Sequence, residues 1–123
     1  MKRYTKDHEW IRLEDSKAFV GISDYAQNSL GDITFVDLPK LGTAFKKGDS
    51  VCVIESVKAA SDVYAPVGGV VESVNNALAD APEKINVSAE TDGWICVLTN
   101  VEMSDLEDLM DEAAYADFVQ KQG

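Results

Sequence analysis

The chain has 123 residues, 46% of them hydrophobic, and its 22 acidic residues against 11 lysines and arginines give a formal charge of −11. We therefore expect one folded domain, residues 1–123, whose surface repels nucleic acids and anionic membranes and attracts basic surfaces of partner proteins. No segment is long and apolar enough to predict a transmembrane helix.

The N-terminal residues and the cysteines bear on location. Met1-Lys2-Arg3 is followed by neither an apolar signal core nor an Arg-rich amphipathic presequence. We expect a cytoplasmic bacterial protein, with a mature mitochondrial form that has lost its transit peptide as the alternative. Cys52 and Cys96 lie in apolar runs, which predicts small buried residues rather than a disulfide framework.

Alternating or wholly apolar runs bounded by turn residues predict a mainly β chain. The predicted strands cover residues 10–14, 18–22, 33–38, 51–54, 63–67, 70–74 and 94–98, and residues 77–86 are predicted to be a loop with at most one helical turn. The runs 51–54 and 95–98 resemble each other, and each follows an earlier strand and a turn containing Gly and Asp. This internal sequence similarity predicts two similar half-units, one in each of two facing sheets.

Two helices are predicted from their ends. Ser23 is a favourable N-cap and Gly31 a favourable residue after the last turn, which predicts a short helix over residues 24–30. Ser104 with Glu107 forms a capping box, which predicts a C-terminal helix over about 104–119. The inner face of this second helix is predicted to hold Leu106, Leu109, Met110, Ala113 and Phe118.

The segment 51–66 reads as strand, tight turn, strand, and it holds Lys58 at its turn among small residues. From spacing alone, Lys58 is either a solvated turn residue or a modification site, because a rigid hairpin tip presents a lysine well to an amide-forming enzyme. The sequence contains few residues or motifs typical of catalysis. His8 is the one histidine, and the chain lacks a Gly-x-Ser-x-Gly motif, a zinc-ligand pattern and a nucleotide-binding Gly-rich loop. We predict no catalytic residues and no metal site, and a structural or rim position for His8.

A series of motifs in order resembles the glycine cleavage system H-protein family over residues 4 to about 118. The motifs are YTKDHEWI at 4–11, VGISDYAQ at 20–27, LGD at 30–32, FVDLP at 35–39, ESVKAASD at 55–62, APV at 65–67 and DGW at 92–94. The resemblance implies a lipoyl-domain-like flattened barrel or sandwich of two sheets (a barrel-sandwich hybrid), with a short early helix and a C-terminal helix. It also implies lipoic acid bound covalently, as an amide, to Lys58.

The function implied by the resemblance is that of a non-catalytic carrier, which shuttles the aminomethyl group of glycine from glycine decarboxylase to the aminomethyltransferase. The implied partners are glycine decarboxylase (PLP), the aminomethyltransferase (tetrahydrofolate), dihydrolipoamide dehydrogenase (FAD), and a lipoyl or octanoyl transferase or lipoate ligase. Two alternatives stay open: a lipoyl relay that donates lipoate to other enzymes, and a binding module in which Lys58 is never modified.

A lipoylated carrier would need further residues around Lys58, and we state their roles as hypotheses. Glu55, three residues before the lysine, is predicted to serve recognition by the lipoylating enzyme, against the alternative of a solvated surface glutamate. The arm is predicted to fold back into a groove beside the early helix, where carboxylates hold the carried cationic amine; the alternative is that the apolar stripe is only core. The predicted groove residues are Glu9, Ile22, Ala26, Leu30 and Asp62.

Two positions depart from the family pattern. Ala89-Glu90 stands where the family often has Pro-Tyr, and Gly68 stands where it usually has Ser. The first departure removes an aromatic and a rigid residue from a loop, which puts the family's partner contacts there in question. Neither departure touches Lys58.

Overall fold

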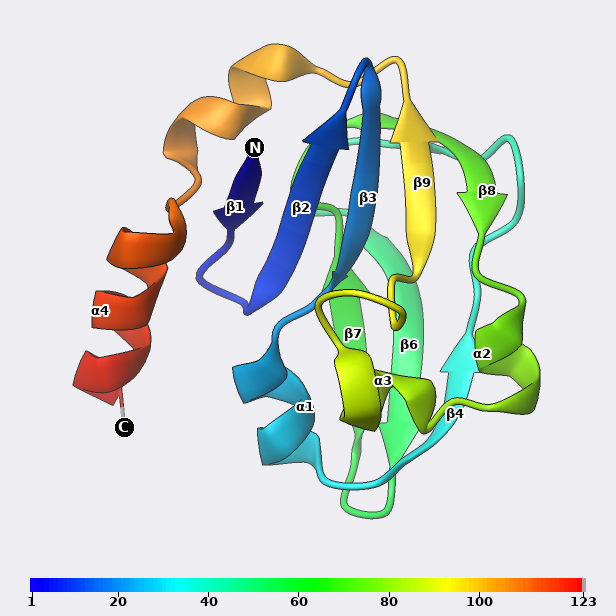
Figure 1. Cartoon of the computed structure of the whole chain (residues 1–123). Helices are drawn as coiled ribbons and strands as arrows, with labels where there is room; N and C mark the ends of the chain where they lie inside the picture. The colour runs from blue at the N-terminus through cyan, green and yellow to red at the C-terminus, as the bar shows by residue number, and fades with distance from the viewer. Residues whose placement is uncertain (123) are drawn as a thin grey trace.

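Two antiparallel β-sheets face each other in the computed structural model, which describes residues 1–122 (Figure 1). One sheet has the strand order β1-β2-β3-β9-β8-β5 and the other β4-β6-β7, so the sandwich is not closed into a barrel. The strands are β1 (Lys2–Tyr4), β2 (Glu9–Glu14), β3 (Lys17–Ile22), β4 (Ile33–Asp37), β5 (Ala44–Phe45), β6 (Ser50–Ser56), β7 (Ala60–Tyr64), β8 (Gly69–Val74) and β9 (Cys96–Thr99). The helices are α1 (Asp24–Leu30), α2 (Ala77–Asp80), α3 (Lys84–Ser88), the 3₁₀ helix η1 (Met103–Asp108) and α4 (Glu112–Gln122).

The predicted two-sheet fold with a short early helix and a C-terminal helix is confirmed. The two copies of the repeated apolar run lie in different sheets, since β6 pairs with β4 and β9 pairs with β8. Their inward side chains meet side chains of the opposite sheet in one core, whose buried members include Val20, Val36, Ile54, Val63, Val71, Ile95 and Leu98. Cys52 and Cys96 are buried free thiols, as predicted, and burial raises the pKa of both.

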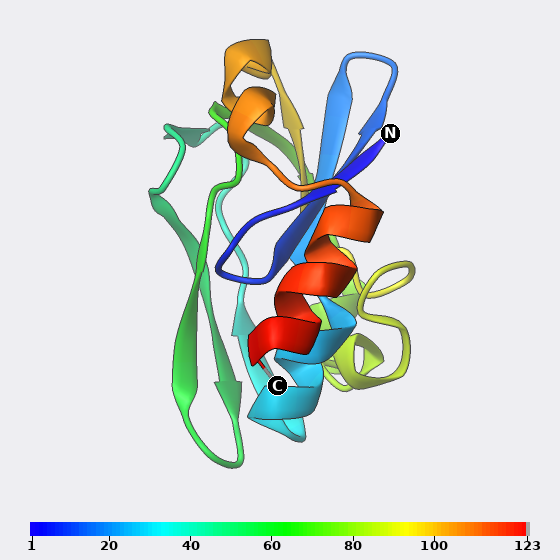
Figure 2. The ribbon, with the colours of Figure 1, turned by 90° about the vertical axis from the view of Figure 1, so that its left-hand side faces the viewer.

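The hairpin of β6 and β7 projects along the small sheet, and its turn forms one end of the molecule in both views (Figures 1 and 2). The predicted return strand at residues 63–67 is wrong in its bounds, because β7 runs from Ala60 to Tyr64. Beyond β7 the Ala65 N–H still donates to the Asp49 carbonyl, and the pairing stops at Pro66, which has no N–H to donate. At the other end of β7 Ala60 pairs with Glu55, so the hairpin stays paired closer to Lys58 than the apolar pattern indicated.

Helix α1 begins and ends where its caps predict. The Ser23 hydroxyl accepts a hydrogen bond from the Ala26 N–H at 3.2 Å, and Gly31 follows the last turn with φ +77°. Its N–H donates to the Gln27 carbonyl, which satisfies one of the last carbonyls of the helix. Helix α1 leaves the large sheet at the end of β3 and leads into β4 of the small sheet.

The prediction of a loop with at most one helical turn over residues 77–86 is too low in helix, because this segment contains α2 and the start of α3. Each of these single-turn helices buries one large apolar side chain, Leu78 in α2 and Ile85 in α3. Burial in the core, rather than intrinsic propensity, therefore holds the two turns.

The predicted continuous helix over 104–119 is also wrong. The chain is extended at Met110, which exchanges two backbone hydrogen bonds with Tyr4, and this bridge separates η1 from α4. Helix α4 starts afresh where the Asp111 carboxylate accepts from the Ala114 N–H at 2.8 Å. Ser104 bonds Glu102 instead of capping a helix.

Helix α4 is held by an aromatic contact that the predicted inner face did not include. Tyr115 is its buried residue and stacks on Tyr4 with ring centroids 4.1 Å apart, whereas Ala113 is exposed. The end of β1, at Tyr4, thereby lies between β2 and the C-terminal helix.

Candidate functional site

The turn that carries Lys58 is fixed by its own backbone and by Ser56. The Ser56 N–H donates to the Ala59 carbonyl at 2.8 Å, and the Ser56 hydroxyl accepts from the Lys58 and Ala59 N–H groups at 3.2 Å each. The Val57 N–H donates to the Asp32 carbonyl at 3.0 Å, which ties the turn to the connection between α1 and β4. Lys58 is exposed and makes no ion pair within residues 1–122.

The side chain of Lys58 lies over Gly31, at the C-terminal end of α1. A Cβ built on Gly31 would be 3.5 Å from Lys58 Cε and 3.8 Å from Lys58 Cδ, so the lysine stem occupies the space beside this glycine. The backbone of Gly31 has φ +77° and ψ −154°, a conformation that favours glycine. The stem thus packs against the C-terminal end of α1.

A cavity of about 190 Å³ lies between α1, the edge strand β7 and the segment that enters β2. All five residues of the predicted groove line it: Glu9, Ile22, Ala26, Leu30 and Asp62. The pattern of the sequence did not indicate the remaining lining residues, which are Asp7, His8, Tyr25, Ser29, Ile54, Ser61 and Val63. The cavity combines an apolar wall from α1 with three carboxylates.

Glu9 is the buried carboxylate of this cavity, with 2% of its surface exposed. It accepts hydrogen bonds from the Thr5 hydroxyl and from the Tyr64 N–H, the latter at 3.2 Å. Burial raises the pKa of Glu9 to about 7 because no cation among the described residues pairs with it. A buried carboxylate held only by neutral donors is a favourable partner for a cationic group that enters the cavity.

His8 lies at the rim of the cavity, as predicted, and connects it to α4. Its Nδ1 is 2.7 Å from the Tyr115 hydroxyl, which in turn is 2.7 Å from the Ser23 hydroxyl. Its ring also packs on Tyr25 with centroids 4.6 Å apart, and burial lowers the pKa of His8. This chain of contacts fixes the C-terminal helix against the start of α1.

The other two predicted acidic residues lie on the exposed side of the hairpin. Asp62 lines the cavity from β7 and accepts a hydrogen bond from the Ser50 hydroxyl at 3.0 Å. Glu55 is exposed on β6 between Phe35 and Ala60 of the neighbouring strands, and it does not line the cavity. Both carboxylates are therefore exposed on the hairpin, but only Asp62 lines the cavity.

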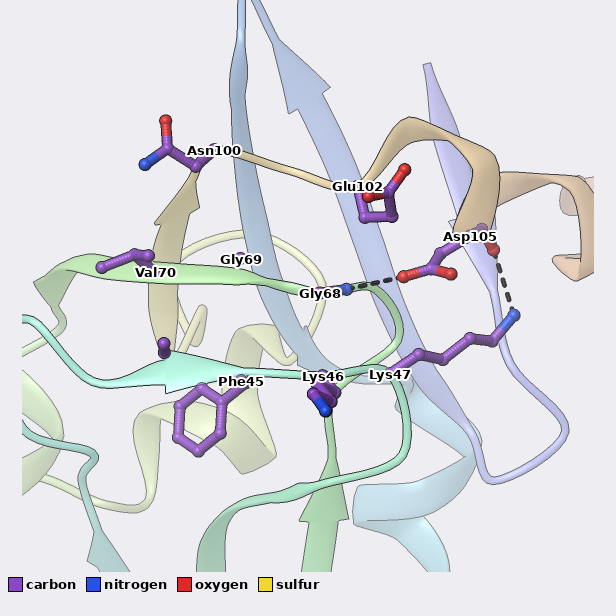
Figure 3. A pocket seen from close by; sticks show the side chains of 10 residues that line it. Phe45, Lys46, Lys47, Gly68, Gly69, Val70, Asn100, Glu102 and Asp105 are labelled. Carbon is purple, nitrogen blue, oxygen red and sulfur yellow. Dashed lines mark hydrogen bonds between the residues drawn. The ribbon is translucent and has the colours of Figure 1, made fainter.

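A larger hollow of about 510 Å³ lies beside β5, the start of β8 and η1, at the end of the molecule away from the lysine turn (Figure 3). Two of its charged residues bond within the domain: Asp105 accepts from the Gly68 N–H at 2.9 Å, and Lys47 Nζ donates to the Asp105 carbonyl at 3.0 Å. Gly68, one of the two departures from the family pattern, thus lies far from Lys58.

The other departure, Ala89-Glu90, is bound inside the domain. The Ala89 carbonyl accepts from Trp10 Nε1 at 2.9 Å. The Glu90 carboxylate accepts from Lys2, the Tyr4 hydroxyl and the Asp24 N–H, and these donors hold its pKa below the usual range despite partial burial. This segment therefore fastens β1 to the start of α1.

Within residues 1–122, no group of three or more His, Cys, Asp and Glu side chains is placed to hold a metal ion. The helices described are all too short or too polar to cross a membrane.

The fold and the site together define a lipoyl-domain-like β protein, in which two facing sheets present a lysine at the tip of a hairpin. The family model described as "Glycine cleavage H-protein" matches residues 2–122. The chain therefore belongs to this family.

Individual relatives agree with this assignment. The chain is 53% identical over 117 residues to the glycine cleavage system H protein of Beijerinckia indica, covering 95% of this chain and 94% of the relative. It is 51% identical over 118 residues to that of Thermotoga maritima, covering 96% and 95%. The crystal structure of a glycine cleavage system H protein from Mycobacterium marinum superposes with a TM-score of 0.85 at 31% identity, covering 99% of this chain and 96% of that one.

Proposed function

We propose that residues 1–123 form a single lipoyl-carrier domain of a bacterial, cytoplasmic glycine cleavage system, with Lys58 as the lipoyl attachment residue. The observation that carries the proposal is the position of Lys58 in a member of this family: exposed on a fixed hairpin turn, with its stem directed over Gly31. The name shared by the relatives favours this role over that of a lipoyl relay.

The residues around Lys58 fit an amide-linked lipoyl group. The ammonium is exposed and its neighbours Ala59 and Ala60 are small, so an attaching enzyme can reach it. The hydrogen bonds of Ser56 and Asp32 hold the turn, which limits the motion of the arm to its own rotatable bonds. When bound, the lipoyl group supplies a disulfide-bearing ring whose sulfur accepts the aminomethyl group from glycine.

The chain's own residues then hold what the arm carries. Ile22, Ala26 and Leu30 provide an apolar wall that excludes water, and an excluded-water site slows hydrolysis of the carried group. Glu9 and Asp62 attract its cationic amine, and the entry of that cation favours the ionised form of Glu9. These residues bind and shelter; none is assigned a catalytic role.

Partner recognition belongs to the outer surface of the hairpin. Glu55 marks Lys58 for the lipoyl or octanoyl transferase or the lipoate ligase, because it is exposed next to the turn. Three enzymes bind in turn at the surface that carries this lysine: glycine decarboxylase, the aminomethyltransferase and dihydrolipoamide dehydrogenase. The net charge of −11 suits weak, salt-sensitive docking to basic surfaces of these enzymes.

The test is reconstitution with purified glycine decarboxylase, aminomethyltransferase and dihydrolipoamide dehydrogenase. The lipoylated protein is expected to support tetrahydrofolate-dependent cleavage of glycine, whereas the unmodified protein and Lys58→Arg are not. A lipoylated protein that fails to support cleavage, yet passes lipoate to another lipoyl domain, would replace the carrier role with the relay.

A further inference from the structure

Asn86, in α3, bonds three groups at the junction of α1 and β4. Its Oδ1 accepts from the Ile33 N–H at 2.9 Å, and its Nδ2 donates to the Gly31 carbonyl at 2.9 Å and to Gln27 Oε1 at 3.0 Å. The side-chain amide orientation is set by these partners, since a backbone N–H requires the oxygen and a carbonyl requires the nitrogen. Figure 1 shows α3 beside α1 at the end of the molecule that carries the β6–β7 turn.

The junction that Asn86 holds is the one on which the lysine turn rests. Gly31 faces the stem of Lys58, and the next residue, Asp32, accepts the Val57 N–H at 3.0 Å. Ile33 pairs with Ser56, whose hydroxyl bonds the Lys58 and Ala59 N–H groups. A single side chain therefore bridges both peptide groups that flank Asp32, the residue that anchors the turn.

We propose that Asn86 is a positioning residue for Lys58: it fixes the junction at Gly31 to Ile33, and so directs the group attached to Lys58 toward the cavity beside α1. The part of this inference that concerns the attached group rests on the proposed function. The part that concerns the lysine turn applies to the unmodified protein as well.

The physical reason is that, within residues 1–122, Asn86 is the side chain that hydrogen-bonds the backbone of the junction at Gly31 and Ile33. Ile33 is buried, so without Asn86 its N–H and the Gly31 carbonyl must be hydrated or the junction must move. Either change shifts Asp32, and with it the carbonyl that holds Val57. Helix α1 has only seven residues and depends on its end contacts, so its wall of the cavity loosens at the same time.

The test compares Asn86→Ala and Asn86→Asp with Asn75→Ala. The Asp variant keeps the size of the side chain but replaces the two donated hydrogen bonds by a carboxylate oxygen facing the Gly31 carbonyl. The control, Asn75, is a buried asparagine that donates to the Asp92 and Trp94 carbonyls at the end of β8. All three variants lose part-buried hydrogen bonds, but only the two Asn86 variants act on the junction.

The readout on the unmodified protein is amide hydrogen exchange of Val57 followed by NMR, with the Val71 amide, which bonds the Thr43 carbonyl, as internal reference. In the Asn86 variants the amide of Val57 is expected to exchange about fivefold faster or more, relative to the amide of Val71. This factor is the change in the local opening equilibrium constant that the loss of one hydrogen bond produces. Asn75→Ala is expected to leave that ratio unchanged. Equal ratios in Asn86→Ala and Asn75→Ala would overturn the inference.

The readout on the lipoylated protein is the lifetime of the loaded carrier, from release of formaldehyde and ammonia. Asn86→Asp is expected to shorten it by about fivefold while Asn75→Ala does not. An unchanged lifetime would overturn the claim that Asn86 directs the arm. A chain that is never lipoylated would instead refute the proposed function, and the exchange measurement would still decide the role of Asn86.

Discussion

The buried carboxylate of Glu9 accepts a hydrogen bond from the backbone N–H of Tyr64 at 3.2 Å. This bond joins the first residue of β2 in the large sheet to β7, the strand that returns from the lysine turn in the small sheet. It places a carboxylate at the open edge between the sheets, within the cavity beside α1. The carboxylate is therefore a contact between the sheets, and under the proposed function it would receive the cationic group that an arm on Lys58 carries.

Replacement of Glu9 by Gln is expected to shorten the lifetime of the loaded carrier by about tenfold, because an amide cannot offer the charge-assisted bond that holds a cationic amine. The measurement is the rate at which the loaded protein releases formaldehyde and ammonia. Glu14→Gln, at an exposed position of β2, serves as control. If the lifetimes of the Glu9 and Glu14 variants agree, Glu9 has no part in holding the amine.

The stability of the unmodified protein should depend on pH through Glu9. The pKa of Glu9 is about 7 in the folded protein against 4.5 in an unfolded chain, so the folded state binds more protons between these values. The contribution of neutral Glu9 is therefore full below about pH 4.5 and is lost as the pH rises through 7, on the order of 3 kcal/mol in total. Urea unfolding from pH 5 to 8 should show this decline in the wild type and a smaller one in Glu9→Gln; parallel curves would contradict it.

Glu55→Ala is expected to lower kcat/KM for attachment of lipoate to Lys58 by about tenfold, since a charge that meets the attaching enzyme is lost. The unfolding free energy should change by no more than about 0.5 kcal/mol because Glu55 is exposed. Glu72→Ala, an exposed change in the other sheet, is the control for altered net charge. Equal attachment kinetics for the two variants would leave Glu55 as a solvated surface residue.

Tyr115→Phe is expected to destabilise the domain by about 1–2 kcal/mol, because the hydroxyl bonds both His8 and Ser23 at 2.7 Å. Thermal or urea unfolding measures this change. In Tyr25→Phe the removed hydroxyl has no hydrogen bond in the part of the chain that the structure describes, so that variant should be nearly neutral. A neutral Tyr115→Phe would show that stacking on Tyr4, rather than the hydroxyl, attaches α4.

The features that the sequence predicts well are those determined by residues close together along the chain. Ser23 and Gly31 mark the ends of α1 because capping is local chemistry, and the structure bears out both ends. The similarity of the apolar runs 51–54 and 95–98 predicts that β6 and β9 lie in different sheets, and they do, because burial follows the hydrophobic pattern. The placement of Glu9 and Asp62 in one cavity also agrees with the geometry expected, although their roles remain predictions.

The features that sequence misses depend on contacts between distant segments. The break between η1 and α4 comes from the pairing of Met110 with Tyr4, and nothing around Met110 alone indicates it. Asn86 reads as one polar residue in an irregular stretch, since its partners Gly31 and Ile33 lie more than fifty positions earlier. Such side-chain to backbone bonds become visible only when the fold brings the segments together.

The most direct test of the central claim is the intact mass of the protein purified from a host that makes lipoate, beside that of Lys58→Arg. We expect one lipoyl increment on the wild type and none on the variant. Both proteins should unfold at the same temperature, because Lys58 is exposed and forms no ion pair within residues 1–122. A wild type without the increment, or a variant that still carries it, would contradict the assignment of Lys58 as the lipoyl attachment residue.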